Sequence, residues 1–171
     1  MGLEGFVTPK IIEIIGNQEI SRVIASLLIF LKIKDNFINK GYQLIFIPSM
    51  RTPQNVIDNV KNFFDKKQII ITKVDKKAYL SALKLATHII VTCDSTSMIS
   101  EAAMTGKPIY VAQMLAIKKN YRFKKFFELF KSLNIIRDLE SSVDEWNYKK
   151  LNETDEISSY IKEQLKNYDF Y

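Results

Sequence analysis

Short apolar runs alternate along the chain with longer stretches of helical periodicity. Isoleucine, valine and their neighbours form five runs of strand length, at residues 11–15, 43–47, 68–72, 88–92 and 108–112. The intervening and following stretches have the apolar spacing of helices. They predict helices at residues 18–34, 53–65, 76–87, 97–105, 118–133 and 154–167.

The predicted strands are almost continuously apolar, which is typical of strands buried on both faces of a parallel sheet. With right-handed crossovers, this order predicts an α/β fold with a doubly wound, Rossmann-like parallel sheet. A chain of 171 residues without a Gly/Ser/Pro-rich linker fits one domain. We expect residues 1–9 to be a leader or linker remnant. We expect residues 137–171 to wrap the domain and end in a helix.

Composition narrows the possible functions. The chain is 47% hydrophobic, and its net charge of +6 comes from scattered lysines without a nucleic-acid motif, so no nucleic-acid partner is expected. A single cysteine and a single histidine exclude an internal disulfide and a Cys/His metal site. We expect no metal and no cofactor. The longest apolar run, residues 23–31, is too short to span a bilayer. Without a signal-peptide pattern, the expected location is the cytoplasm.

The densest chemical signal follows the fourth predicted strand. Ser and Thr side chains there suit a helix N-cap, and the free N–H groups of a helix start can bind phosphate. Glu101 follows one helical turn beyond Ser97, where its carboxylate can accept hydrogen bonds from a ribose. The alternative is a well-capped helix without a ligand. The candidate ligand-binding residues of this segment are Asp94, Ser95, Thr96, Ser97, Met98 and Glu101. The helix is expected to stop at Gly106.

Two further loops follow predicted strands and supply three more candidate ligand-binding residues, Gly16, Arg51 and Thr52. Thr52 is placed to cap the second helix, with Pro53 at its first position. Arg51 then lies at the carboxyl edge of the sheet, where its planar fork suits a diphosphate, unless it is simply solvated. Gly16 follows the first strand and permits a tight turn near a ligand, although the loop is not a GxGxxG motif.

Other reactive residues are interpreted as structural. His88 and Asp94 lie six residues apart along a predicted strand, too far for a hydrolytic pair. Cys93 is expected in the core. The basic, aromatic segment at residues 118–130 is either a membrane-surface helix or a core-facing stripe. The stripe is favoured, because its phenylalanines recur at helical spacing: Phe123, Phe126, Phe127 and Phe130.

Together these segments resemble the "elongated mitochondria" fission family. The resemblance covers residues 11–165 and rests mainly on residues 91–111. Ser49–Pro53 and the aromatic tail support it, the latter with Phe123, Phe126, Arg137, Trp146, Asn147 and Tyr148. The family is similar to GT-B glycosyltransferases and nucleotide-sugar epimerases, which implies the C-terminal domain of a GT-B protein.

That resemblance implies a ligand and roles for particular residues. The C-terminal domain of GT-B proteins holds a nucleotide-sugar. By position, residues 95–97 would bind the diphosphate and Glu101 the ribose. Arg51 would face the phosphates and Gly16 would line the cleft. The expected ligand is therefore a nucleoside diphosphate or nucleotide-sugar.

Departures from the family pattern keep other hypotheses open. Met50 stands where the family usually has a second arginine, and Asn17 where it has a second glycine. Family members also carry a complete N-terminal domain, which in GT-B enzymes holds the acceptor site and usually the catalytic base. Catalytic residues are therefore unassigned here. The resemblance implies a bacterial protein, whose activity as a glycosyltransferase would need a separate N-terminal domain. The expected protein partner is a separate N-terminal chain or a second copy in a homo-oligomer. The alternatives are a non-enzymatic scaffold left by a split gene and a peripheral membrane protein.

Overall fold

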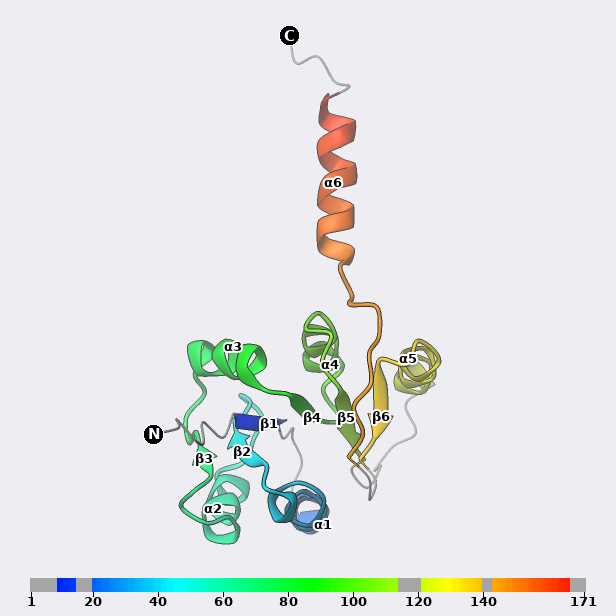
Figure 1. The fold of residues 1–171 in the computed structure, drawn as a ribbon. Coiled ribbons are helices and arrows are strands. Elements are labelled where there is room, and N and C mark those ends of the chain that lie inside the picture. The colour runs from blue at the N-terminus through cyan, green and yellow to red at the C-terminus, as the bar shows by residue number, and fades with distance from the viewer. Residues whose placement is uncertain (1–8, 15–19, 114–120, 140–142, 167–171) are drawn as a thin grey trace, which may run out of the picture.

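The protein forms one parallel β-sheet with helices on both faces (Figure 1). The computed structural model describes residues 9–14, 20–113, 121–139 and 143–166. The strands are β1 Pro9–Ile14, β2 Gln43–Phe46, β3 Ile69–Ile70, β4 His88–Thr92, β5 Ile109–Ala112 and β6 Ile136–Asp138. The helices are α1 Ile20–Asn36, the short 3-10 helix η1 Ile38–Lys40, α2 Gln54–Phe63, α3 Lys76–Leu85, α4 Thr96–Ala103, α5 Tyr121–Ser132 and α6 Glu153–Lys166.

The strand order places a topological switch point at the centre of the sheet. The order is β3-β2-β1-β4-β5-β6, and every adjacent pair is parallel. After β1 the chain moves outward to β3, then returns to β4 on the other side of β1, with Ile11 opposite His88. In such sheets the crevice beyond the carboxyl ends of the strands at the switch point is where ligands bind. The predicted doubly wound fold is confirmed.

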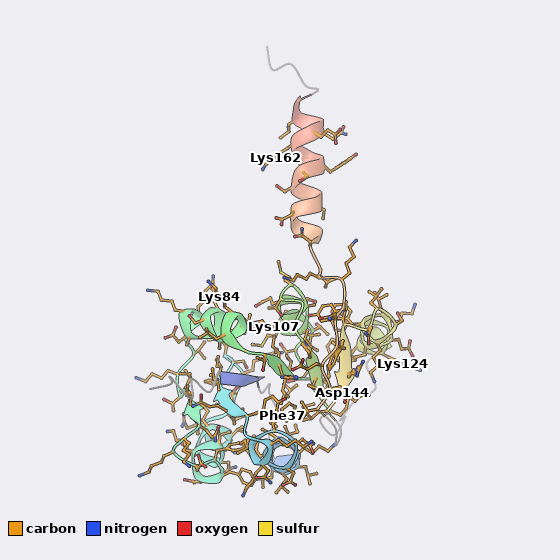
Figure 2. All side chains as sticks on the ribbon, viewed as in Figure 1. Phe37, Lys84, Lys107, Lys124, Asp144 and Lys162 are labelled. Atoms are coloured by element: carbon orange, nitrogen blue, oxygen red, sulfur yellow. The ribbon has the colours of Figure 1, made fainter. Side chains whose placement is uncertain are left out.

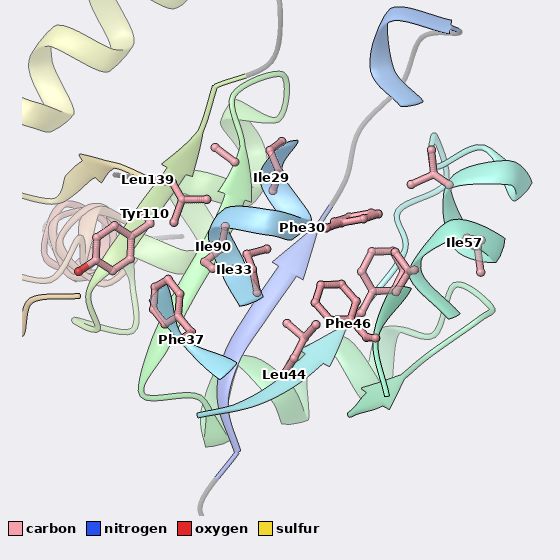
Figure 3. Packing of buried hydrophobic residues seen from close by; sticks show 14 of the residues in the cluster. Ile29, Phe30, Ile33, Phe37, Leu44, Phe46, Ile57, Ile90, Tyr110 and Leu139 are labelled. Carbon is pink, nitrogen blue, oxygen red and sulfur yellow. The ribbon is translucent and has the colours of Figure 1, made fainter. Parts of the chain in front are cut away.

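Alternating side chains along the strands build two core clusters. Leu44 and Phe46 pack into the α1–α2 core cluster, formed with the buried side chains of those two helices (Figure 3). Ile45 and Ile47 point the opposite way, into the α3–α5 core cluster formed with α3, α4 and α5. This period of two is intrinsic to a pleated strand. Burial of one aliphatic side chain stabilises the fold by about 1.5–3 kcal/mol. Both helical layers are therefore held firmly against the sheet.

Helix α3 is fixed at both ends. The Asp75 carboxylate accepts hydrogen bonds from the backbone N–H groups of Lys77 and Ala78 at 2.8 and 3.0 Å. At the other end, Lys107 Nζ donates to the carbonyl oxygens of Leu83 and Lys84 at 2.7 and 2.6 Å. Free N–H groups begin a helix and free carbonyls end it, so each side chain meets the groups that need a partner.

The structure differs from three sequence-based expectations. Residues 136–138 form the edge strand β6, although this region was expected only to wrap the domain. Helix α4 ends at Ala103, before Gly106, which lies in the following turn with φ +74°. Along α5, Phe126 and Phe127 pack against the α3–α5 core cluster and Phe130 is buried in it, but Phe123 is exposed.

Helix α6 stands apart from the sheet and its covering helices (Figures 1 and 2). Its apolar side chains are largely exposed, with Ile157 at 58% and Tyr160 at 63% of full accessibility. Ile161 and Leu165 continue the same helical spacing. Among the described residues, no helix is both long and apolar enough to cross a membrane.

Candidate functional site at the sheet switch point

The loop between β4 and α4 lies directly at the switch point. Ser95 occupies the N-cap position of α4 and is 2% exposed. Its carbonyl accepts the hydrogen bond from the Ile99 N–H at 3.1 Å, which starts the helix. Its hydroxyl does not bond to the N–H groups of the first turn. The side chain at the cap therefore leaves the first-turn N–H groups to other acceptors, which favours an anion there.

A turn after β2 brings Arg51 to this helix start. The Ser49 N–H donates to Thr52 Oγ1 at 2.9 Å, and the Arg51 N–H donates to Ser49 Oγ at 3.2 Å. The turn directs the guanidinium toward α4, with Arg51 Nη2 at 3.4 Å from Ser95 Oγ. Two loops that follow different strands thus place a cation beside a helix N-terminus.

Two predictions about this turn have different outcomes. The prediction that Thr52 caps α2 is wrong, because its hydroxyl accepts from Ser49 and Pro53 occupies the N-cap position. Arg51 does lie at the carboxyl edge of the sheet, as its position after β2 predicts. Met50, beside it, is 85% exposed. Gly16, the remaining candidate of this edge, lies outside the described residues.

The first turn of α4 divides its side chains between solvent and core. Ser97 is exposed, Thr96 is half-buried, and Met98 packs against the α3–α5 core cluster. Hydroxyl groups therefore remain on the accessible side, whereas Met98 has only its backbone to offer a ligand. Asp94 precedes the cap, and its Oδ1 atom is buried without a hydrogen-bond partner among the described residues. Cys93 packs against the same cluster, in agreement with its interpretation as a structural residue.

Glu101 has a partner that the sequence did not reveal. Tyr79, on α3, donates its hydroxyl to Glu101 Oε2 at 2.8 Å. The Tyr79 ring packs against the α3–α5 core cluster, while the Glu101 side chain is exposed. Burial, followed by the hydrogen bond to Glu101, raises the pKa of Tyr79 well above its usual value. Twenty-two positions separate the two residues, so no local pattern signals the pair.

His88 lies at the amino ends of the strands, opposite the switch-point site. It begins β4, is buried, and packs edge-on against the rings of Phe37 and Tyr42 at centroid distances of 6.1 and 5.3 Å. Thr87 Oγ1 lies 3.1 Å from its Nδ1 atom. The interpretation of His88 as a packed histidine is confirmed, and it takes no part in the switch-point site.

A cavity lies beside β5 and β6, away from the switch point. This cavity of about 340 Å³ is lined by Tyr110, Lys131, Asn134, Ile136, Arg137, Asp138 and Asp144. Its charges are largely paired, since Lys131 bonds Asp138 and Arg137 contacts Asp144 at 3.1 Å. Burial alone would raise the pKa of Asp138, but hydrogen bonds from Lys131 and Gln113 outweigh it and lower that pKa. The cavity therefore offers little uncompensated charge to a ligand.

Comparison with known proteins shows the family of this chain. Residues 23–165 match the family described as mitochondrial fission ELM1. The chain belongs to the mitochondrial fission ELM1 family. It is 33% identical over 162 residues to the uncharacterized protein RP120 of Rickettsia prowazekii, covering 88% of this chain. It is also 30% identical over 122 residues to mitochondrial fission protein ELM1 of Arabidopsis thaliana, covering 68% of this chain. The sequence-based assignment to this family is confirmed.

This ELM1-family chain spans less than half the length of each of these two relatives. It covers 43% of the length of the Rickettsia protein and 28% of the Arabidopsis protein. A crystal structure of a candidate UDP-N-acetylglucosamine 2-epimerase from Listeria monocytogenes is similar, with a TM-score of 0.53 and 14% identity. That match covers 95% of this chain and 47% of the other. It establishes a common GT-B-like fold.

Proposed function

We propose that this ELM1-family domain binds a nucleoside diphosphate, alone or as part of a nucleotide-sugar, at the switch point. The observation that carries the proposal is the approach of the Arg51 guanidinium to the buried Ser95 hydroxyl at the start of α4. An arginine and a helix N-terminus that converge on one point are complementary to a diphosphate. Sugar transfer by this domain would require residues supplied by a second domain or chain.

Each part of a nucleoside diphosphate would have its own partner at this site. Phosphate oxygens would accept hydrogen bonds from the N–H groups of the first turn of α4 and from Arg51. The exposed hydroxyl of Ser97 lies on the same turn. The Glu101 carboxylate, one helical turn further, would accept from the ribose hydroxyls. No resident cofactor is required for this binding.

A thermal-shift titration tests the proposal. The probes are ADP, GDP, CDP, UDP and UDP-N-acetylglucosamine, the compound in the name of the Listeria protein. A probe at ~100 times its Kd stabilises a protein by about 2.7 kcal/mol, which shifts Tm by several degrees. We expect one of these probes to produce that shift and Arg51→Ala to reduce it strongly.

Lys61→Ala is the matched control, because it removes one exposed positive charge from the last turn of α2, away from the helix start at Ser95. It should retain the shift of the wild-type protein. The proposal is wrong if none of the probes stabilises the wild-type protein, or if Arg51→Ala keeps the full shift.

A further inference from the structure

Tyr79 is positioned by its helix and by the core beside it. It lies in the first turn of α3, where its N–H donates to the Asp75 carbonyl at 3.0 Å. Asp75 in turn caps that helix through two backbone N–H groups. The ring packs partly buried against the α3–α5 core cluster. Its hydroxyl therefore has a fixed position relative to α4.

The Glu101 side chain, in contrast, is exposed and not held by packing. It lies on the exposed side of α4, where a long carboxylate side chain can adopt several rotamers. The bond from Tyr79 to Oε2, at 2.8 Å, selects one of them. An ionised carboxylate has about four acceptor positions, so Oε1 and one lone pair of Oε2 remain available.

We propose that Tyr79 is a positioning residue that orients the Glu101 carboxylate toward the ribose hydroxyls of the bound nucleotide. This inference rests on the proposed function and extends it to ribose recognition. A tyrosine suits the role because it remains a neutral donor at physiological pH, and burial of Tyr79 favours its protonated form. Discrimination between ribose and 2′-deoxyribose should then depend on Tyr79, although Tyr79 itself is not required to touch the nucleotide.

The experiment compares ribose preference across a set of variants. Calorimetric titration would measure Kd for ADP, GDP, CDP and UDP and for the 2′-deoxy form of each. The variants are Tyr79→Phe, Glu101→Ala and the double variant. Tyr160→Phe is the control, because it removes the same hydroxyl from an exposed residue of α6. Phe retains the ring that packs in the core, and Tm measured without nucleotide confirms that each variant is folded.

We expect wild type to prefer the ribose form of the nucleotide that it binds. Ribose preference is the Kd of the 2′-deoxy form divided by the Kd of the ribose form. Tyr79→Phe should reduce this ratio by roughly five- to tenfold, the range expected for one hydrogen bond. Glu101→Ala should reduce it at least as far. The double variant should match Glu101→Ala, because Tyr79 acts through Glu101. Tyr160→Phe should keep the wild-type ratio.

The outcomes that overturn the two proposals differ. If the wild-type protein binds one of the nucleotides but Tyr79→Phe keeps its ribose preference, the role of Tyr79 is wrong and the proposed function stands. Equal weakening of ribose and deoxyribose forms has the same meaning, because it shows a structural role only. If none of the eight nucleotides binds the wild-type protein, the role of Tyr79 is wrong. If UDP-N-acetylglucosamine does not bind either, the proposed function fails with it.

Discussion

The hydroxyls of Tyr79 and Tyr110 each connect two segments of the domain that are distant in the sequence. Besides Tyr79, Tyr110 Oη accepts from the Asp144 N–H at 2.6 Å and lies 3.1 Å from the Asp144 carbonyl, to which it donates. Tyr148 packs between the two core clusters as a partly buried side chain of the segment before α6. Burial raises the pKa of Tyr148 from 10.0 to about 12. The folded state therefore favours the neutral phenol.

This preference predicts a loss of stability at alkaline pH. The pKa of Tyr148 is higher in the folded state, so its contribution is complete below pH 10 and is lost as pH rises from 10 toward 12. Urea unfolding of wild type should give a free energy of unfolding that falls over this range. Tyr148→Phe should show a shallower fall, with Tyr160→Phe as the exposed control. Identical slopes for wild type and Tyr148→Phe would contradict the prediction.

The N-terminal ends of α3 and α4 are capped differently. Asp75 caps α3 with its side chain, whereas Ser95 begins α4 without a side-chain cap and has Arg51 beside its hydroxyl. Lys107 closes the other end of α3, and burial followed by repulsion from Lys150 lowers the pKa of its amine. Side chains therefore satisfy the backbone groups at both ends of α3, whereas no side chain caps the start of α4.

Asp75→Ala should destabilise the domain by about 1 kcal/mol, because two N–H groups lose their acceptor. Denaturant unfolding at neutral pH measures the change. Asp58→Ala on α2 is the matched control: its contact with Lys61, at 3.9 Å, joins two exposed side chains, so the cost should stay under about 0.5 kcal/mol. Equal costs for the two variants would show that the Asp75 cap contributes nothing specific.

Elements with a buried, regular pattern could be predicted from the sequence, and elements fixed by tertiary contacts could not. The predicted strand at residues 88–92 matches β4, whose apolar centre of Ile89, Ile90 and Val91 is visible in the sequence. All five of its residues are buried. β6 escaped prediction because it is three residues long and ends in Arg137 and Asp138, whose partners come from other segments. In the site, the hydroxyl-rich start of α4 was visible as a pattern. Tyr79 was not, since its role depends on the packing of α3 beside α4.

At the scale of the whole molecule, apolar side chains are buried in the sheet and its covering helices but exposed on α6. The sheet and its covering helices bury two continuous clusters, whereas α6 leaves its apolar side chains open to solvent. Apolar residues at similar positions along their helices therefore contribute very differently to stability. Ile99 on α4 is fully buried, and Ile161 on α6 is 49% exposed.

A pair of identical substitutions tests this division. Ile99→Ala should cost about 2–5 kcal/mol, because it leaves a cavity in the α3–α5 core cluster. Ile161→Ala should change the free energy of unfolding by less than about 0.5 kcal/mol. Urea unfolding of dilute protein compares the two with wild type. A large cost for Ile161→Ala would mean that α6 packs on the domain more closely than the structure shows.

The strand order also affects how the chain folds during synthesis on the ribosome. β1 emerges first, yet it lies in the middle of the sheet and pairs on one side with β4. Until His88–Thr92 has been synthesised, β1 to β3 can form only a partial sheet in which β1 is an open edge. Such long-range pairing slows folding. The newborn chain therefore passes through an interval in which its future centre is an exposed edge, the stage at which a chaperone would matter most.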